Sequence, residues 1–179
     1  MLKSSMGSVF YIGNFQLPDG NAACQRVLSN AKLLNLSGME THVITSNLEN
    51  VSTSALNIYE GINCHSPVSK SSKWSKVYQF LTNSRIRKIL SKTQQSGDII
   101  ILYNAPVSLI FPMYLYAKWK KCKLVLDLSE YYSSSGMSFP WGWLKSIDTF
   151  LRMNFCWMLA HGVITTSALL TNKYEKYCC

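Results

Sequence analysis

The segment DLSEYY places two carboxylates and two phenol rings directly after a short apolar run. A strand is expected to end near Asp127, which leaves Glu130 in the loop that follows. Two carboxylates at this spacing support acid–base chemistry or bind sugar hydroxyls, and Tyr131 and Tyr132 offer surfaces for stacking. A second interpretation fits the spacing equally well: Asp127 caps a turn and Glu130 lies in solvent.

A glycine-containing loop follows the first apolar run of the chain, in the segment VFYIGNFQLPDGN. Gly13 and Gly20 lack side chains, so the backbone can approach a ligand closely at both positions. Backbone N–H groups at the start of the next helix can hold a phosphate. The loop matches neither the GxGxxG fingerprint nor the phosphate-binding motif that ends in GK[ST]. The alternative is a loop whose glycines serve only its turns.

The cysteines and histidines do not form a recognisable site. The six cysteines are scattered, form no CxxC pair and have no histidine at zinc-finger spacing, so we expect no metal site and no disulfide framework. Scattered thiols fit a reducing cytoplasm. His42 and His65 have no partner nearby in the sequence, and a histidine within an apolar strand, such as His42, is typical of a structural residue. No GxSxG motif of a serine hydrolase is present.

The formal net charge of +9 favours anionic partners. Basic residues gather on and before one predicted helix, with Trp74 and Tyr78 among them: Lys70, Lys73, Lys76, Arg85, Arg87, Lys88 and Lys92. This cluster either meets an anionic membrane surface or is the solvated side of a helix that packs by its apolar face. No nucleic-acid-binding motif is present, and we expect no nucleic-acid partner.

The elements that position these residues alternate between strands and helices. Strands are predicted over residues 8–12, 41–45, 98–102, 123–128 and 163–165, with short strands near 55–58 and 61–63. Helices are predicted over residues 22–36, 73–95, 107–119, 141–160 and 168–177. Ser167 is expected to cap the last helix, Gly13 to stop the first strand, and residues 14–21 to form a loop.

One stretch, Ile99 to Ala117, carries no charge and is long enough to be scored as a membrane-spanning helix. Asn104, Pro106 and Pro112 interrupt it, and its β-branched beginning is typical of a buried strand. We therefore expect a strand, a loop and a helix in that order.

Alternating strands and helices predict an α/β fold: one Rossmann-like domain over residues 1–179, with an open, mostly parallel sheet and helices on both faces. Ligands of such sheets bind beyond the carboxyl ends of the strands. Gly13, Asn104 and Glu130 each follow a predicted strand. We therefore expect these three residues at one edge of the sheet.

Three segments resemble, in order, the N-terminal domain of family 4 retaining glycosyltransferases, which have the GT-B architecture. VFYIGNFQLPDGNAACQRVLSNAKLLNLSGMETHVITSN resembles the family's opening strand, glycine loop and helix with an internal arginine. GDIIILYNAPVSLIFPMYLYAKWKKCKLVLDLSEYY resembles the central D-x-(I/V)-x-x-Y-x-x-P segment and a strand ending in D-x-x-E-x-Y. HGVITTSALLTNKYEK resembles the A-D-x-V-I-x-x-S-x-x-L strand and helix, with His161 where the family has aspartate.

The resemblance implies transfer of a sugar from a nucleotide-sugar to an acceptor, often lipid-linked, in the synthesis of surface polysaccharide or glycolipid. By position it places Gly20 and Asn21 in the cleft that faces the donor diphosphate, and Glu130 on the acceptor side. The full set of expected substrate-binding residues is Gly13, Gly20, Asn21, Asn104, Glu130 and Tyr131. No catalytic residue is assigned, and no metal or cofactor is implied beyond the nucleotide-sugar co-substrate.

The family's donor-binding half, with its two-glutamate motif, has no counterpart in residues 1–179. We therefore expect the chain to be inactive alone and to need a donor-domain partner chain. Its other expected partners are a sugar or lipid-linked acceptor and an anionic membrane, which it contacts peripherally from the cytoplasm.

Two alternative functions remain open at this stage. One is a non-catalytic subunit that recruits a split transferase to the membrane. The other is a different Rossmann-like nucleotide-binding enzyme, such as a nucleotide-dependent reductase. Against the reductase, Ser46 and Asn47 stand at the end of the second strand, where an acidic residue would bind the ribose.

Overall fold

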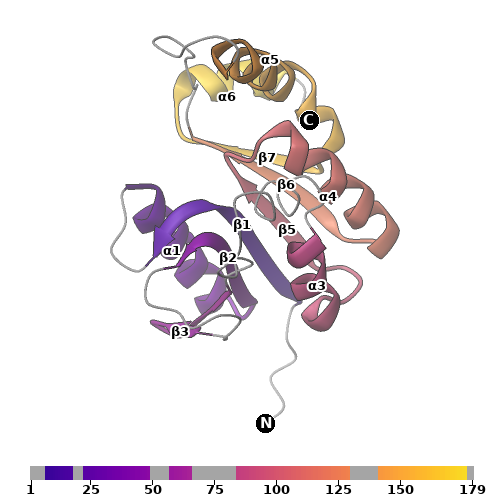
Figure 1. Ribbon diagram of the computed structural model, residues 1–179. Helices are drawn as coiled ribbons and strands as arrows, with labels where there is room; N and C mark the ends of the chain where they lie inside the picture. Colours follow the sequence, from indigo (N-terminus) through magenta and orange to yellow (C-terminus); the bar gives the residue numbers. More distant parts are fainter. Residues whose placement is uncertain (1–6, 18–21, 49–56, 66–83, 130–140, 177–179) are drawn as a thin grey trace.

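The computed structural model describes residues 7–17, 22–48, 57–65, 84–129 and 141–176. Within these ranges, seven strands form one sheet in the order β3-β4-β2-β1-β5-β6-β7 (Figure 1). They are β1 (Ser8–Leu17), β2 (Glu40–Leu48), β3 (Asn57–Tyr59), β4 (Ile62–His65), β5 (Ile99–Tyr103), β6 (Lys123–Leu128) and β7 (Gly162–Thr165). All neighbouring strands are parallel except β3 and β4, which are antiparallel. The predicted α/β fold with a mostly parallel sheet is confirmed.

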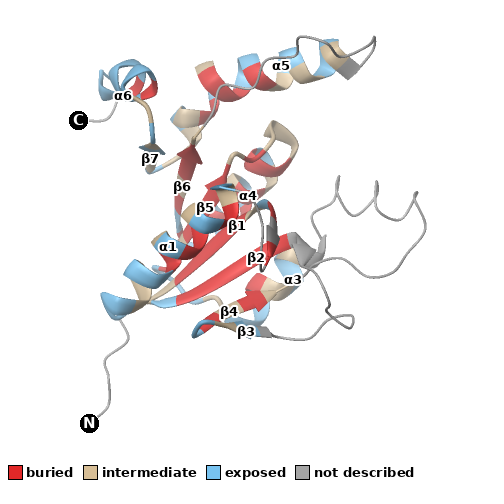
Figure 2. Ribbon diagram, turned by 90° about the vertical axis from the view of Figure 1, so that its left-hand side faces the viewer, coloured by how far each residue is buried: buried red, intermediate tan, exposed pale blue. Residues whose placement is uncertain are grey.

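Helices cover both faces of the sheet, as predicted (Figure 2). They are α1 (Ala22–Leu36), α3 (Ser84–Thr93), α4 (Val107–Lys120), α5 (Trp141–Asn154), the short 3-10 helix η1 (Cys156–Leu159) and α6 (Ala168–Glu175). Helix α1 packs with Tyr11 and Val43 into the core on one face. Helices α3, α4, α5 and α6 pack with Ile12 and Ile100 into the core on the other face.

The central strands carry apolar residues on both of their sides because helices cover both faces of the sheet. Ile12 and Leu102 point into one core, while their neighbours Tyr11 and Ile101 point into the other, as the alternation of side chains along a strand requires. The uncharged stretch that could be scored as a membrane span is divided between β5 and α4. No helix in the described ranges is both long and apolar enough to cross a membrane.

The first strand is longer than predicted. It passes through Gly13 and continues to Leu17. Phe15 and Leu17 are buried, and the pairing with β2 resumes at Gln16 and Leu17. The register with β2 shifts between Gly13 and Gln16. At this shift the Thr45 hydroxyl donates to the carbonyl of Phe15 and accepts from its N–H. The first part of the predicted loop therefore belongs to the strand.

The other boundaries agree with the predictions to within a few residues. Helix α1 has the predicted bounds, and Ser167 caps α6 by accepting a hydrogen bond of 3.3 Å from the N–H of Leu170. Helix α5 ends at Asn154, earlier than predicted, and η1 follows it. Helix α3 begins at Ser84, and the earlier part of the helix predicted over residues 73–95 lies outside the described residues.

Two histidines that are distant in the sequence meet between neighbouring strands. The parallel pairing of β2 and β4 brings Nδ1 of His42 to 3.1 Å from Nε2 of His65. His42 is buried, stacks on the ring of Phe10 and has a carboxylate oxygen of Glu40 3.3 Å from its Nε2. Burial lowers the pKa of His42, against the raising effect of Glu40 and Asp98. Burial, together with the neighbouring imidazole, lowers the pKa of His65 to about 4.

This pair predicts that the protein loses stability in mild acid. A histidine in the unfolded chain takes up a proton below about pH 6.5, whereas His65 stays neutral in the fold down to a pKa of about 4. The contribution of His65 is therefore complete above about pH 6.5. Between about pH 6.5 and 4 we expect the free energy of unfolding to fall by about 1 kcal/mol per pH unit because of this group.

Urea unfolding at a series of pH values measures this slope. The matched variant is His65→Gln, which keeps a polar group beside His42 but cannot titrate. Its free energy of unfolding should depend less on pH than that of the wild type. Identical slopes for the two proteins would contradict the assignment.

Candidate functional site

The carboxyl ends of three central strands meet at one edge of the sheet. Gly13 on β1 pairs with Tyr103 on β5, and Tyr103 pairs with Asp127 on β6. Gly13 and Asn104 therefore lie at the same edge, as predicted. The remaining expected site residues lie outside the described residues: Gly20, Asn21, Glu130 and Tyr131.

Gly13 is required by close packing at this edge. A Cβ atom on Gly13 would lie 2.9 Å from the ring of Phe15 and 3.0 Å from Cβ of Tyr103. The two rings contact each other edge to face, with centroids 6.0 Å apart. The glycine thus lets β1 bend into its register shift against β5, which is a structural reason for its presence beside the ligand-binding one.

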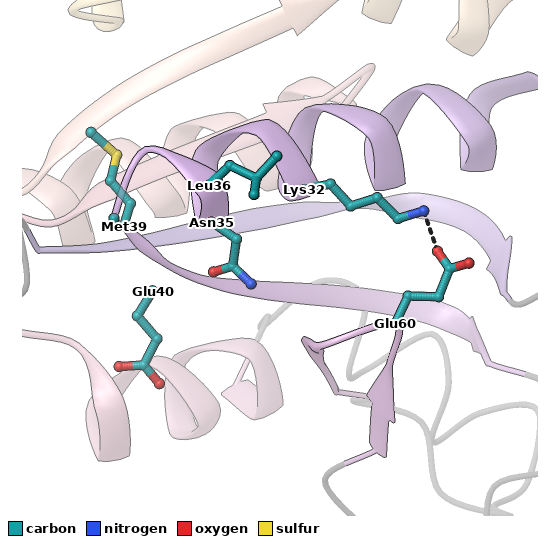
Figure 3. A pocket seen from close by; sticks show the side chains of 7 residues that line it. Lys32, Asn35, Leu36, Met39, Glu40 and Glu60 are labelled. Atoms are coloured by element: carbon teal, nitrogen blue, oxygen red, sulfur yellow. Dashed lines mark ion pairs between the residues drawn. The ribbon is translucent and has the colours of Figure 1, made fainter.

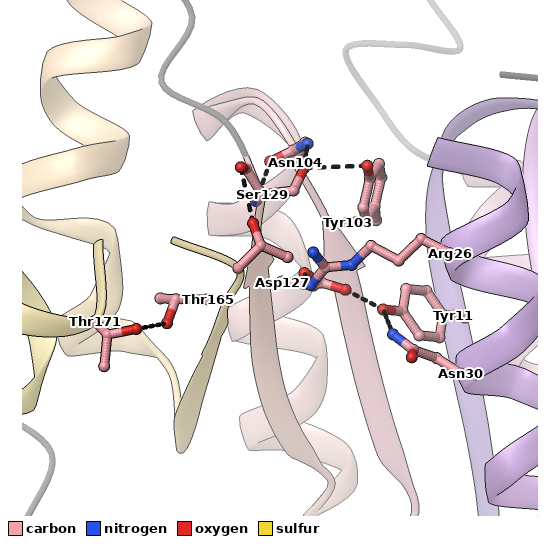
Figure 4. A network of polar contacts seen from close by, with 10 residues as sticks. Tyr11, Arg26, Asn30, Tyr103, Asn104, Asp127, Ser129, Thr165 and Thr171 are labelled. Atoms are coloured by element: carbon pink, nitrogen blue, oxygen red, sulfur yellow. Dashed lines mark hydrogen bonds and ion pairs between the residues drawn. The ribbon is translucent and has the colours of Figure 1, made fainter. Parts of the chain in front are cut away.

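Asn104 joins the loops that follow β5 and β6 (Figure 4). Its φ of 43° lies in the left-handed region, which asparagine tolerates better than most residues. Its N–H donates to the carbonyl of Asp127 at 2.9 Å. Its side-chain amide donates to Oγ of Ser129 at 2.5 Å, and its carbonyl oxygen accepts from the Ser129 N–H at 3.1 Å. Both ends of the Asn104 amide are therefore used in fixing Ser129.

Ser129 is held from two further directions. Its hydroxyl donates to the phenol oxygen of Tyr103 at 3.0 Å, and its carbonyl accepts from the hydroxyl of Thr166 at 2.9 Å. The loops after β5, β6 and β7 are thus linked through one serine. Sequence analysis missed Ser129. Its position between Asp127 and Glu130 in DLSEYY was the available signal.

Asp127 lies under the edge, in a buried network that reaches from β6 to β1 and α1 (Figure 4). Its side chain has no exposed surface. One carboxylate oxygen is 2.5 Å from Nη2 of Arg26, and the other accepts a hydrogen bond from the hydroxyl of Tyr11. Asn30 on α1 donates to the same hydroxyl at 3.3 Å. Sequence analysis offered two interpretations of Asp127, a ligand-binding or acid–base group and a turn cap, and neither includes this ion pair.

The electrostatics of the network follow from burial. Burial raises the pKa of Asp127, while the Tyr11 hydroxyl and the Arg26 guanidinium lower it. Burial and the adjacent carboxylate raise the pKa of Tyr11, so its proton stays on the phenol. With no exposed surface, Asp127 is not open to a substrate. We conclude that it positions Arg26 and Tyr11 and is not an acid–base group.

Sequence analysis mentioned Arg26 only as part of a family resemblance. It is the internal arginine of the helix that follows the glycine loop, and its side chain is 19% exposed. Its Nε and Nη1 atoms are buried and have no hydrogen-bond partner within the described part of the chain. The arginine one turn into this helix is visible in the sequence, but no local pattern indicates its ion pair with the carboxylate at the end of β6.

Helix α5 turns polar side chains toward the edge. Asp148 accepts a hydrogen bond of 2.7 Å from the N–H of Val107, the first residue of α4. Arg152 is buried and donates from Nη1 to the carbonyl of Asn104 at 3.2 Å. Of the large apolar side chains of α5, Met153 packs into the core, whereas five others are exposed: Trp143, Leu144, Ile147, Phe150 and Leu151.

A hollow at the other end of α1 has a structural explanation (Figure 3). It is lined by Lys32, Asn35, Leu36, Gly38, Met39, Glu40 and Glu60. Lys32 and Glu60 form an ion pair across it, and Asn35 bonds to the backbone of Gly61 and Thr41. Its polar groups thus serve the packing of α1 against β2 and the β3–β4 turn. No group of three or more potential metal ligands occurs in the described ranges.

The strand order and the placement of helices define a Rossmann-like α/β fold. A solved structure with a similar fold is the catalytic domain of starch synthase IV from Arabidopsis thaliana, bound to ADP and acarbose. The TM-score is 0.50 at 14% sequence identity, and the match covers 74% of this chain and 38% of that chain. The chain thus has a glycosyltransferase-like fold. No protein-family model and no curated protein matches the sequence.

The buried ion pair allows a quantitative prediction. Replacing Arg26 with methionine leaves the Asp127 carboxylate buried without its cation. We expect Arg26→Met to lower the free energy of unfolding by about 3–5 kcal/mol. The double variant Arg26→Met/Asp127→Asn removes the uncompensated charge and should recover part of this loss. Urea unfolding of the variants and the wild type measures these differences.

Lys123→Met serves as the matched control, because Lys123 is exposed at the start of the same strand as Asp127. We expect it to change the free energy of unfolding by less than about 0.5 kcal/mol. If Arg26→Met were as mild as this control, the ion pair would not be holding the edge together.

Proposed function

We propose that this chain is the acceptor-side half of a retaining glycosyltransferase of family 4 type, which binds an acceptor for sugar transfer from a nucleotide-sugar. The observation that carries the proposal is the convergence of the β1, β5 and β6 ends at one polar edge of a glycosyltransferase-like fold. Ligands of open parallel sheets bind beyond this edge. The acceptor belongs to the synthesis of a surface polysaccharide or a glycolipid.

The binding residues of the proposed site come from β1 and from the loops at this edge. Gly13, Gly20 and Asn21 line the side that faces the donor, and Asn104, Glu130 and Tyr131 line the acceptor side. Support for the acceptor side comes from Ser129, the residue before Glu130. Because Ser129 is fixed by Asn104, Tyr103 and Thr166, the loop that carries Glu130 and Tyr131 starts from a defined position.

The donor-binding half is a separate part of the proposed enzyme. The match spans only 38% of the length of the starch synthase chain, whose structure contains ADP. In our proposal a donor domain supplies the nucleotide-sugar site, and residues 1–179 alone do not catalyse transfer. The enzyme uses no metal or cofactor besides the nucleotide-sugar, binds no nucleic acid and works in the cytoplasm.

Acceptor binding tests this proposal directly. Saturation-transfer NMR with a panel of soluble oligosaccharides, acarbose included, should detect binding to the chain of 179 residues. Glu130→Ala and Tyr131→Ala should each weaken that binding about tenfold or more, since one lost charge-assisted hydrogen bond or stacking contact is worth about 1.4 kcal/mol or more. Lys32→Ala, in the hollow at the other end of α1, is the control and should bind like the wild type.

The same preparation tests the division of labour between the halves. Incubated with nucleotide-sugars and the best-binding saccharide, the purified chain should release no nucleoside diphosphate above background. Turnover by the chain alone would overturn the assignment to the acceptor side. Tight binding of a nicotinamide cofactor, with no saccharide binding, would favour the nucleotide-dependent reductase instead.

A further inference from the structure

Helices α3 and α4 lie on the same face of the sheet and expose an apolar stripe with basic residues around it. Phe111, Leu115 and Trp119 follow one another at intervals of four, which places them on one side of α4. Their side chains are 53%, 50% and 73% exposed. The core-facing residues of the same helix, such as Ile110 and Met113, are fully buried.

A groove runs between this stripe and α3. Its α4 side is formed by the stripe with Pro112 and Tyr116, and its α3 side by Arg87, Lys88 and Ser91. Helix α3 packs against the core through Ile86, Ile89 and Leu90, so Arg87 and Lys88 point outward. The groove therefore has an apolar side on α4 and a basic side on α3.

Positive charge continues at the end of the groove where α3 and α4 both finish, and neither helix contains an acidic residue. Lys92 lies in the last turn of α3, and Lys118, Lys120 and Lys121 lie around the end of α4. Nζ of Lys120 lies 4.2 Å from the centre of the Trp119 ring. Neither the sequence SRIRKILSKT of α3 nor VSLIFPMYLYAKWK of α4 contains an aspartate or a glutamate.

We infer that this groove and stripe dock the protein on an anionic lipid bilayer. Exposed aromatic and aliphatic side chains enter the interfacial region of a membrane, while neighbouring lysines and arginines bind the lipid phosphates. A tryptophan beside lysines at a helix end is the arrangement favoured at that depth. The apolar side of α5 does not share this charge pattern, because Arg152 is turned inward.

This inference deepens the proposed function, since a lipid-linked acceptor would lie in the membrane on which the chain docks. It also extends the expected membrane contact from the basic segment to α4. The basic segment from Lys70 to Lys92 was the expected contact, and only its part from Ser84 onward is described. The exposed stripe of α4, a segment for which sequence analysis predicted only a helix, supplies the apolar contact.

Flotation with vesicles of two compositions tests the docking surface without any acceptor or donor. The wild type should bind vesicles of phosphatidylcholine with roughly one third phosphatidylglycerol, and should bind neutral phosphatidylcholine vesicles far less. Arg87→Glu/Lys88→Glu should weaken the anionic binding about 25-fold or more, at about fivefold for each basic residue. Added salt should weaken the binding of the wild type to anionic vesicles, and should have little further effect on the weak binding of this variant.

A second variant tests the apolar side of the groove. Leu115→Ser/Trp119→Ser changes only exposed side chains, so the fold should survive, and it should also reduce vesicle binding by at least tenfold. Lys173→Glu/Lys176→Glu, in α6 and directly after it, makes the same charge change as the α3 variant at exposed positions elsewhere, and this variant should bind nearly like the wild type. Circular dichroism of each variant checks that it is folded.

Three outcomes would overturn the inference. Equal loss of binding in the α6 control would mean that net charge alone attracts the chain. Wild-type binding by either groove variant would place the contact elsewhere. Equal binding of the wild type to neutral and anionic vesicles, or no binding to either, would show that the groove does not recognise anionic lipid, and would favour a protein as its partner. Because no sugar is present, vesicle binding can succeed even if the proposed acceptor binding fails.

Discussion

The buried carboxylate of Asp127 is held by Arg26 and Tyr11, and this contact spans the centre of the sheet. Tyr11 is on β1 and Asp127 is on β6, with β5 between them, while Arg26 reaches over from α1. Two charges removed from water are costly unless they meet in good geometry, so this pair fixes α1 relative to the far strands. The carbonyl of Asp127 also holds the N–H of Asn104, which in turn fixes Ser129. The contacts that fix Asn104 and Ser129 at the polar edge therefore depend on the position of Asp127 in this ion pair.

Local patterns predicted the fold well because they report what each segment buries. The spacing of apolar residues predicted the bounds of helix α1, and the short apolar runs identified the central strands. Their alternation with helices predicted that the strands are parallel, but not their order in the sheet. Gly13 misled the prediction of β1. It looked like a strand stop, whereas the apolar Phe15 and Leu17 beyond it, alternating with polar residues, continue the strand.

Contacts between elements could not be predicted in this way. Whether His42 meets His65 depends on β4 lying beside β2, which no local pattern encodes. The same holds for Asp127, whose partner is about a hundred residues away in the sequence, so that its carboxylate looked equally suited to catalysis or to a turn. Amphipathic spacing likewise identifies two sides of a helix but not which side faces inward. Helix α5 turns Asp148 and Arg152 inward together with Met153, and leaves most of its large apolar side chains exposed.

The orientation of α5 has a thermodynamic consequence for the polar edge. Its inner side holds the N–H of Val107 and the carbonyl of Asn104, the two ends of the connection between β5 and α4. Its outer side carries the exposed side chains of Trp143 and Phe150. A molecule that binds the outer side and shifts the helix must alter those two hydrogen bonds, and a ligand that tightens the connection must favour one helix position. Binding of a molecule to the outer side of α5 and binding of a ligand at the polar edge are then linked. Each bound molecule changes the affinity of the protein for the other by the same factor.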